Sequence, residues 1–170
     1  DSAKRRAVWL GINLLTAFLA AAVIDLFEAT IQQIVVLAVL MPIVASMGGI
    51  AGSQTLTLVV RGLALRQVSE LNSRKLLNKE VSVGLMNGLI WAIVVSLVAG
   101  MWFHNFDISL LLGVAMIINL ACAAAAGVLI PVALDKMGVD PALAGGVLLT
   151  TVTDVVGFMA FLGLATLFLL

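Results

Sequence analysis

The amino-acid sequence predicts an all-α, polytopic membrane protein with five transmembrane helices. Of its 170 residues, 63% are apolar and only 11% are charged, which is more apolar surface than one soluble core of this size can bury. The apolar residues form long runs between short charged or turn-rich breaks, as expected of helices that each need about 20 apolar residues to cross a bilayer. Residues 1–170 are therefore predicted to form one compact membrane domain.

The first two predicted helices lie on either side of an acidic break. The first covers residues 7–24 and ends before the segment 25–28, "DLFE". The second covers residues 30–65, and its roughly 36 residues would form a continuous helix about 54 Å long, far beyond a bilayer core of about 30 Å. This helix must protrude, tilt steeply or break. We expect a break or kink at Pro42 or in the glycine-rich segment 48–52.

Three further apolar runs predict the remaining helices. The third helix is predicted over residues 79–103, after a basic connection at 66–79 that we expect to lie mostly at the membrane interface. The fourth covers residues 108–134 and includes "NLACAAAAG" (119–127), whose small side chains predict a helix-packing surface. The fifth covers residues 141–169.

Charge placement predicts how these helices are oriented. All nine Lys and Arg residues lie at the amino terminus, around the second-to-third connection or in the fourth-to-fifth connection, which five spans place on one side. The opposite side carries Asp25, Glu28, His104 and Asp107 and no basic residue. Because basic segments stay cytoplasmic, we expect a cytoplasmic amino terminus and an external carboxyl terminus in a cell (inner or plasma) membrane.

The fifth predicted helix carries an acid at mid-membrane depth. In "VDPAL", Asp140 is predicted to cap the helix and Pro141 to occupy its first position, where the missing N–H costs nothing. Asp154 lies 13 residues further on, or about 20 Å along a helix. A charge near the bilayer centre costs at least about 2.5–3.5 kcal/mol. No Lys or Arg is predicted at this depth, so the acid has no obvious ion-pair partner.

Asp154 has a structural and a functional interpretation. It could be protonated, or hydrogen-bonded to a neighbouring helix, and serve only to hold helices together. Alternatively, it could bind a cation or a proton, because intramembrane acids commonly mark ion pathways. Thr150, Thr151 and Gly157 share its helix face. We favour the ion site, since hydroxyls beside an unpaired acid suit a cation better than a packing role.

We expect the second predicted helix to face Asp154 at the same depth and to form the opposite wall of an ion path. Counting back about 13 residues from Arg61, or about 20 Å, reaches Gly48, within "SMGGIAGSQTLT" (46–57). Glycines allow close backbone approach, and Ser and Gln add oxygen atoms. The alternative is that these glycines only pack helices, and Asn13, Asn87 and Asn119 are expected mainly to hydrogen-bond between helices. The residues that we predict to line a path are Gly48, Gly49, Ser53, Gln54, Thr151 and Gly157.

Two sequence blocks resemble a known family. "MPIVASMGGIAGSQTLTLVVRGLALR" (41–66) and "MGVDPALAGG…TTVTDVVGF" (137–158) are similar to the membrane domain of the MgtE magnesium channels, and the resemblance covers essentially the whole chain. It implies a homodimer with a pore on the two-fold axis, walled by the second and fifth helices of both chains. It also implies that Asp154 binds the metal ion and that the backbone carbonyl of Thr150 is a neighbouring contact.

The resemblance further implies cytoplasmic modules that this chain does not contain. In the family, an N-domain and CBS modules that sense magnesium precede the membrane domain, so we expect this chain to be a fragment of a longer protein. Two positions depart from the family pattern: Ile50 stands where Asn is common, and Gly146-Val147 stands where an Asn-Pro pair is common. These departures affect the polar surroundings of the acid rather than the acid itself.

Ligand chemistry independently favours a hydrated divalent cation. One Asp per chain gives two carboxylates at a dimer axis, and Mg²⁺ usually keeps several waters while using one or two carboxylates. We therefore predict a channel domain, not an enzyme, that conducts Mg²⁺ into the cell. Two alternatives remain: a proton- or Na⁺-coupled divalent-cation carrier, and a non-conducting membrane anchor that dimerises a sensor. The sequence shows no catalytic arrangement such as a nucleophile–base pair or a phosphate loop.

Overall fold

The computed structural model describes residues 1–170, except for the side chain of Glu70. Over the described residues every regular element is a helix, and five helices are long and apolar enough to cross a membrane. These are α1, α3, α4, α5 and α6, so the predicted all-α, five-span architecture is confirmed. The elements in chain order are α1 (Ser2–Asp25), α2 (Glu28–Gln33), α3 (Val36–Ala64), α4 (Glu70–Phe103), α5 (Phe106–Lys136) and α6 (Pro141–Leu169).

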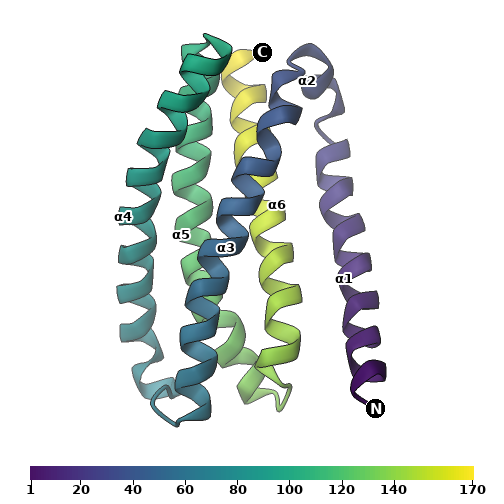
Figure 1. Cartoon of the computed structure of the whole chain (residues 1–170), viewed down its shortest axis with the longest axis vertical. Coiled ribbons are helices and arrows are strands. Elements are labelled where there is room, and N and C mark those ends of the chain that lie inside the picture. Colours follow the sequence, from purple (N-terminus) through teal and green to yellow (C-terminus); the bar gives the residue numbers. More distant parts are fainter.

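Helix α5 lies at the centre of the bundle. It packs against α3, α4 and α6, whereas α1 packs mainly against α6 and lies at the edge (Figure 1). α3 runs obliquely across α5 and α6 in the same view. Small residues of the predicted packing surface 119–127, including Ala123, Ala124 and Gly127, are buried here. Their size lets the neighbouring helices approach the α5 backbone closely.

Helix α4 packs against α5 through a stripe of small residues that recur at every fourth position. Gly84, Gly88 and Ala92 are buried, and a Cβ added at Gly84 would lie 2.9 Å from the backbone oxygen of Leu120. A Cβ at Gly88 would lie 3.1 Å from the Cα of Ile117. Residues four apart share a helix face, so the absence of side chains along this stripe permits the close α4–α5 contact.

The expected break of the second helix occurs at a different place. α3 is continuous through Pro42 and through the glycines at 48, 49 and 52, so the predicted break at these residues is wrong. The chain instead breaks between α2 and α3, where Ile34 has φ −129° and ψ 79°. The run "IVV" at 34–36 is β-branched, and such side chains disfavour the helical conformation. The break shortens the span and leaves α2 as a separate short helix.

Capping residues fix the other helix ends. α4 begins at Glu70, nine residues before the predicted start at 79, and the Asn72 side chain accepts a hydrogen bond from the Ser69 backbone N–H at 2.8 Å. Asn105 caps α5 by accepting from the backbone N–H of Ile108 at 3.1 Å. The start of α6 is as predicted. The Asp140 carboxylate accepts from the backbone N–H of Ala142 at 3.0 Å, with proline in the first turn.

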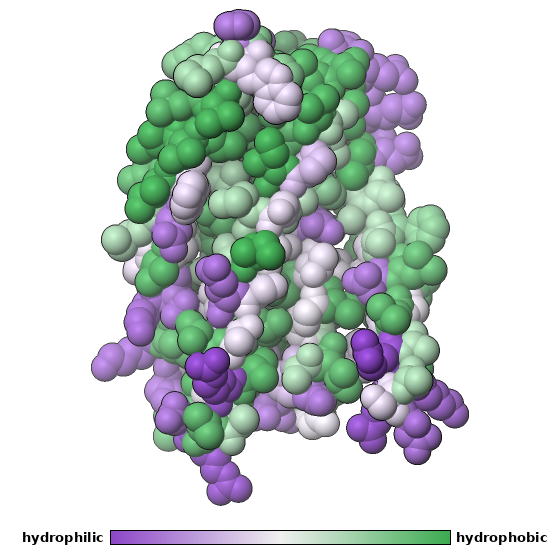
Figure 2. Space-filling model, viewed as in Figure 1, coloured by the Kyte–Doolittle hydropathy of each residue, from purple (hydrophilic) through white to green (hydrophobic). Residues whose placement is uncertain are grey.

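The ends of the bundle match the predicted charge asymmetry. The amino terminus and the α3–α4 and α5–α6 connections, which carry the basic segments, lie at one end (Figure 1). The carboxyl terminus, α2 and the α4–α5 connection lie at the other. Hydrophobic residues dominate the surface between the ends, although paler and hydrophilic residues run through the middle of the face that α3 crosses (Figure 2).

This arrangement predicts which end is accessible from each side of the membrane. We expect an impermeant maleimide to label Phe106→Cys in intact cells and Met137→Cys only after permeabilisation, in a background where the single cysteine, Cys122, is replaced by alanine. Phe106 is 76% exposed and Met137 is 73% exposed, so exposure itself does not distinguish them. Labelling with the opposite sidedness would reverse the predicted orientation.

Candidate functional site

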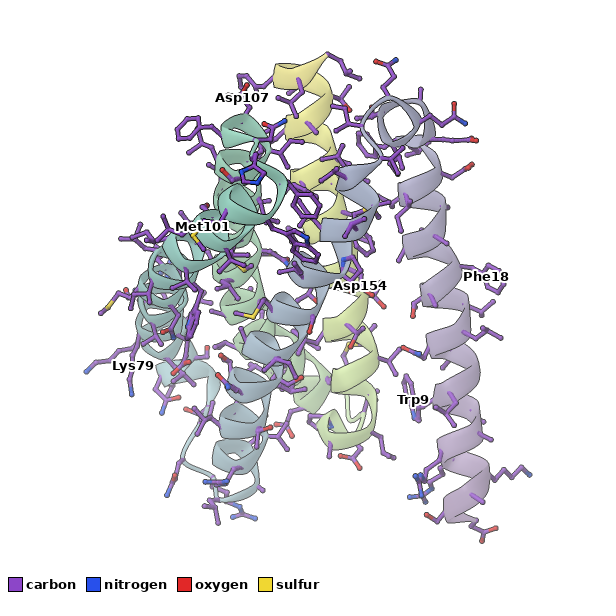
Figure 3. The ribbon with its side chains drawn as sticks, turned by 45° about the horizontal axis from the view of Figure 1, so that its top comes forward. Trp9, Phe18, Lys79, Met101, Asp107 and Asp154 are labelled. Atoms are coloured by element: carbon purple, nitrogen blue, oxygen red, sulfur yellow. The ribbon has the colours of Figure 1, made fainter. Side chains whose placement is uncertain are left out.

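Asp154 lies in the middle of α6 with its carboxylate unpaired. The side chain is half-buried, and among the described residues it has no hydrogen-bond or ion-pair partner. In Figure 3 it projects from α6 toward the side on which α1 lies, and Trp9 of α1 points toward the same region while Phe18 points away. A carboxylate that only held helices together would be bonded to one of them. The structure therefore gives no intrachain support to that interpretation.

Contacts between α3 and α6 place the glycines of α3 at the level of Asp154. A Cβ added at Gly52 would lie 2.8 Å from the Leu149 side chain, nearer the end of the bundle that carries the amino terminus. Nearer the opposite end, Gly48 and Gly157 both contact the side chain of Asn119. Because α3 and α6 run antiparallel, Asp154 lies between these two contact levels, at the depth predicted from the sequence.

Small and polar residues form an open face beside this acid. On α3, Ser46, Ser53 and Thr57 are exposed, and a Cβ added at Gly49 would meet no atom within 4 Å. On α6, Thr150 is exposed one turn from Asp154. The open face is defined by the α3 residues Ser46, Gly49, Ser53 and Thr57 and the α6 residues Gly146, Thr150, Thr151 and Asp154.

Three hydroxyl groups of the open face donate to their own helices. Ser53 Oγ donates to the carbonyl of Gly49 at 2.8 Å, and Thr57 Oγ1 donates to the carbonyl of Ser53 at 2.8 Å. Thr151 Oγ1 likewise donates to the carbonyl of Val147 at 2.8 Å. A hydroxyl that has donated its single hydrogen keeps two acceptor lone pairs. These groups can therefore accept hydrogen bonds from water molecules.

The backbone carbonyl of Thr150 already has a side-chain donor. Thr153 Oγ1, which is fully buried, donates to it at 3.1 Å. A carbonyl oxygen has two lone pairs, so this bond reduces the capacity of the Thr150 carbonyl for a further contact. Of the two predicted metal contacts, the Asp154 carboxylate is thus the less engaged within the chain.

Three predicted path residues lie away from the open face. Gly48 and Gly157 are buried and turned toward Asn119. Gln54 is exposed, but it shares a helix face with Ala51, three residues earlier, which packs against the α4–α5 cluster around Ala92. The structure brings Gly49, Ser53, Thr151, Thr150 and Asp154 to the open face and gives the two glycines a packing role.

The sequence interpretation missed Glu80, a carboxylate that is more deeply buried than Asp154. Glu80 on α4 is 8% exposed, and its Oε2 accepts a hydrogen bond from Thr55 Oγ1 of α3 at 3.4 Å. The sequence does indicate this burial, because Glu80 lies four residues before Gly84, on the same face of α4 as the stripe of small residues. That position predicts that its side chain faces the bundle interior, behind α3.

The ligand set of the site is sparse. Among the described residues, no three His, Cys, Asp or Glu side chains group together to hold a metal ion. Structural zinc sites need about four protein ligands, and Ca²⁺ takes about 6–8 oxygen ligands. A single carboxylate with hydroxyl acceptors nearby suits transient contact with an ion that keeps its water.

Comparison with known proteins identifies the family. Residues 41–164, which include most of α3 and of α6, match the model of the family MgtE, described as a divalent cation transporter. The chain belongs to the MgtE family. It is therefore a multi-pass membrane protein of a transporter family, not an enzyme.

Curated MgtE relatives align along nearly all of this chain. It is 32% identical over 168 residues to the magnesium transporter MgtE of Enterococcus faecalis and 30% identical over 168 residues to that of Bacillus subtilis, covering 99% of this chain in both cases. It is 32% identical over 165 residues to the magnesium transporter MgtE of Thermus thermophilus. The chain spans only 37% of the length of the first two relatives and 36% of the third.

The unpaired state of Asp154 predicts the effect of its neutralisation on stability. We expect Asp154→Asn to leave the free energy of unfolding unchanged or to raise it, because no intrachain bond is lost and a charge leaves the membrane interior. The isosteric change Thr55→Val should lower it by about 1–3 kcal/mol, because Glu80 loses its hydrogen-bond donor. Both are measured by unfolding in mixed detergent–SDS micelles. A loss of stability in Asp154→Asn as large as that in Thr55→Val would assign Asp154 a structural role.

Proposed function

We propose that this chain is the ion-conducting domain of a Mg²⁺ channel, which passes the hydrated ion into the cell through a pore on a homodimer axis. The observation that carries the proposal is the unpaired Asp154 carboxylate at mid-bundle depth beside the open face. In this proposal α3 and α6 of both protomers line the pore. The names of the relatives, each a magnesium transporter, support Mg²⁺ as the transported ion.

The polar character of the open face supports dimerisation. Hydrocarbon offers no hydrogen bonds, so a membrane protein gains nothing by exposing Ser46, Ser53, Thr57 and Asp154 to lipid. Pairing two copies through this face would enclose these residues around water. A two-fold axis would also bring two carboxylates together, and a divalent cation between them balances their charge.

The sparse ligand set supports conduction of an ion with its water shell. Mg²⁺ loses water reluctantly and is usually held through one or two carboxylates with several waters retained. In the proposed pore, the Asp154 carboxylates attract the ion, and the lone pairs of the Ser53, Thr57 and Thr151 hydroxyls accept hydrogen bonds from its water molecules. In this proposal the Thr150 carbonyl contributes only a weaker water contact, because Thr153 already donates to it.

The length of the relatives supports a further proposal about partners. Because this chain aligns with little more than a third of each relative, we propose that it works beside cytoplasmic N-domain and CBS modules of a longer polypeptide. The basic connections at the cytoplasmic end are the surfaces nearest to such modules. The coupled-carrier alternative would require a proton or Na⁺ gradient, which an ion channel does not need.

Neutralising the acid should abolish transport without dissociating the protein. We expect Mg²⁺ influx into proteoliposomes under a voltage, without a pH or Na⁺ gradient, and a loss of at least about tenfold in Asp154→Asn because the ion no longer meets an opposite charge. Influx is read with an entrapped Mg²⁺ indicator at matched protein content.

The matched control is Asp107→Asn, an exposed carboxylate at the external end of α5. Its influx should stay close to that of the native protein. Equal influx in native protein and Asp154→Asn would show that Asp154 is not part of the pathway. Influx that appears only with a proton or Na⁺ gradient would favour the carrier.

A further inference from the structure

One amide side chain is fully buried where α3, α5 and α6 meet. Asn119 of α5 is 0% exposed, and its Nδ2 donates a hydrogen bond to the backbone carbonyl of Val44 on α3 at 2.9 Å. Its Oδ1 is also buried and has no hydrogen-bond partner among the described residues. The amide therefore joins α5 to α3 through one defined bond.

Two glycines create the space that Asn119 occupies. A Cβ added at Gly48 of α3 would overlap the Asn119 Nδ2, and a Cβ added at Gly157 of α6 would lie 2.9 Å from the same atom. The Val44 side chain would also lie 3.2 Å from a Cβ at Gly157. The amide is thus wedged between the two helices that we propose to line the pore.

Stability alone does not account for an amide at this position. An amide oxygen buried without a donor costs about 1–3 kcal/mol, whereas an apolar side chain of similar size carries no such cost. Polar groups in membrane helices more often fix how helices pair than add large stability. The amide instead fixes one lengthwise register between α3 and α5, because its Nδ2 group donates only to the Val44 carbonyl.

We propose that Asn119 is the positioning residue that sets the spacing and register of α3 and α6 behind Asp154, and through them the width available to the ion's water shell. This inference rests on the proposed function. Gly157 lies three residues from Asp154, or about 4.5 Å along the helix, so a shift of α6 at the wedge moves the carboxylate. The side chain itself does not face the open face, so in this proposal it acts on the ion only through the positions of α3 and α6.

The packing part of the proposal is tested by a double-mutant cycle on unfolding. Gly48→Ala should destabilise the native protein, because the new methyl group meets Asn119, and should be tolerated when combined with Asn119→Ala. Gly49→Ala is the matched control, since a methyl group there meets no neighbour and should have the same small effect in both backgrounds. Equal effects of Gly48→Ala with and without Asn119 would overturn the wedge.

The functional part is tested by the ratio of Mg²⁺ to Ca²⁺ influx in proteoliposomes. A ratio does not depend on how much protein is folded, so a merely structural role would not change it. We expect the ratio to fall roughly two- to thirtyfold in Asn119→Ala. It should stay low in Asn119→Ala with Gly48→Ala, which refills the space but does not restore the bond to Val44. Asn87→Ala, at an exposed amide on α4, should keep the native ratio.

The outcomes separate the two proposals. If native protein conducts Mg²⁺ and Asp154→Asn does not, a native ratio in Asn119→Ala overturns the positioning role and leaves the channel in place. If native protein conducts neither ion, the channel and the positioning role are both overturned. A reduced ratio in Asn119→Ala that returns to native in the double variant would assign the effect to volume alone and overturn the role of the amide bond.

Discussion

In the hydrocarbon core of a membrane, a polar atom has no water to bond, so it must find a partner within the protein or face a water-filled space. This constraint explains most of the polar side chains in the bundle. The hydroxyls of Ser53, Thr57, Thr151 and Thr153 all donate to backbone carbonyls of their own helices. Asp154 has no such bond, because a carboxylate cannot donate, and its position beside these hydroxyls supports the water-filled space that we propose there.

The small residues of the bundle have a second role, because they let the helices pack closely beside the open face. Helices in lipid gain little from burying apolar side chains, so close backbone approach supplies much of their attraction. Gly84 and Gly88 bring α4 onto α5, and Gly127 admits Thr55 of α3, while Gly48 and Gly157 admit Asn119. The tightly packed side of α3 and α6 thus faces α5, and the loosely packed, polar side is left for another surface.

Much of this could be predicted from the sequence because hydropathy and charge placement depend on residue type alone. The five spans, the cap at Asp140 and the depth of Asp154 followed from run lengths and a constant helical rise. The break at Ile34 did not, because proline and glycine are tolerated inside membrane helices whose neighbours support them. A β-branched run at the end of a span was the more informative signal.

The sequence alone does not show which neighbour each glycine faces. Gly48 and Gly49 are adjacent and chemically identical, yet one is turned toward Asn119 and the other toward open space. Successive residues of a helix point about 100° apart, so the role of each depends on which neighbour lies on which side. Glu80, by contrast, was predictable from its place four residues before Gly84 on the small-residue stripe of α4.

The most direct test of the central claim is a structure of the membrane-embedded protein with Mn²⁺, an oxygen-preferring substitute for Mg²⁺ that gives anomalous scattering. We predict a two-fold dimer paired through the open face, with a metal signal on the axis between two Asp154 side chains and water between metal and protein. A dimer paired through another face, or a metal signal elsewhere in the membrane with Asp154 facing lipid, would contradict this prediction.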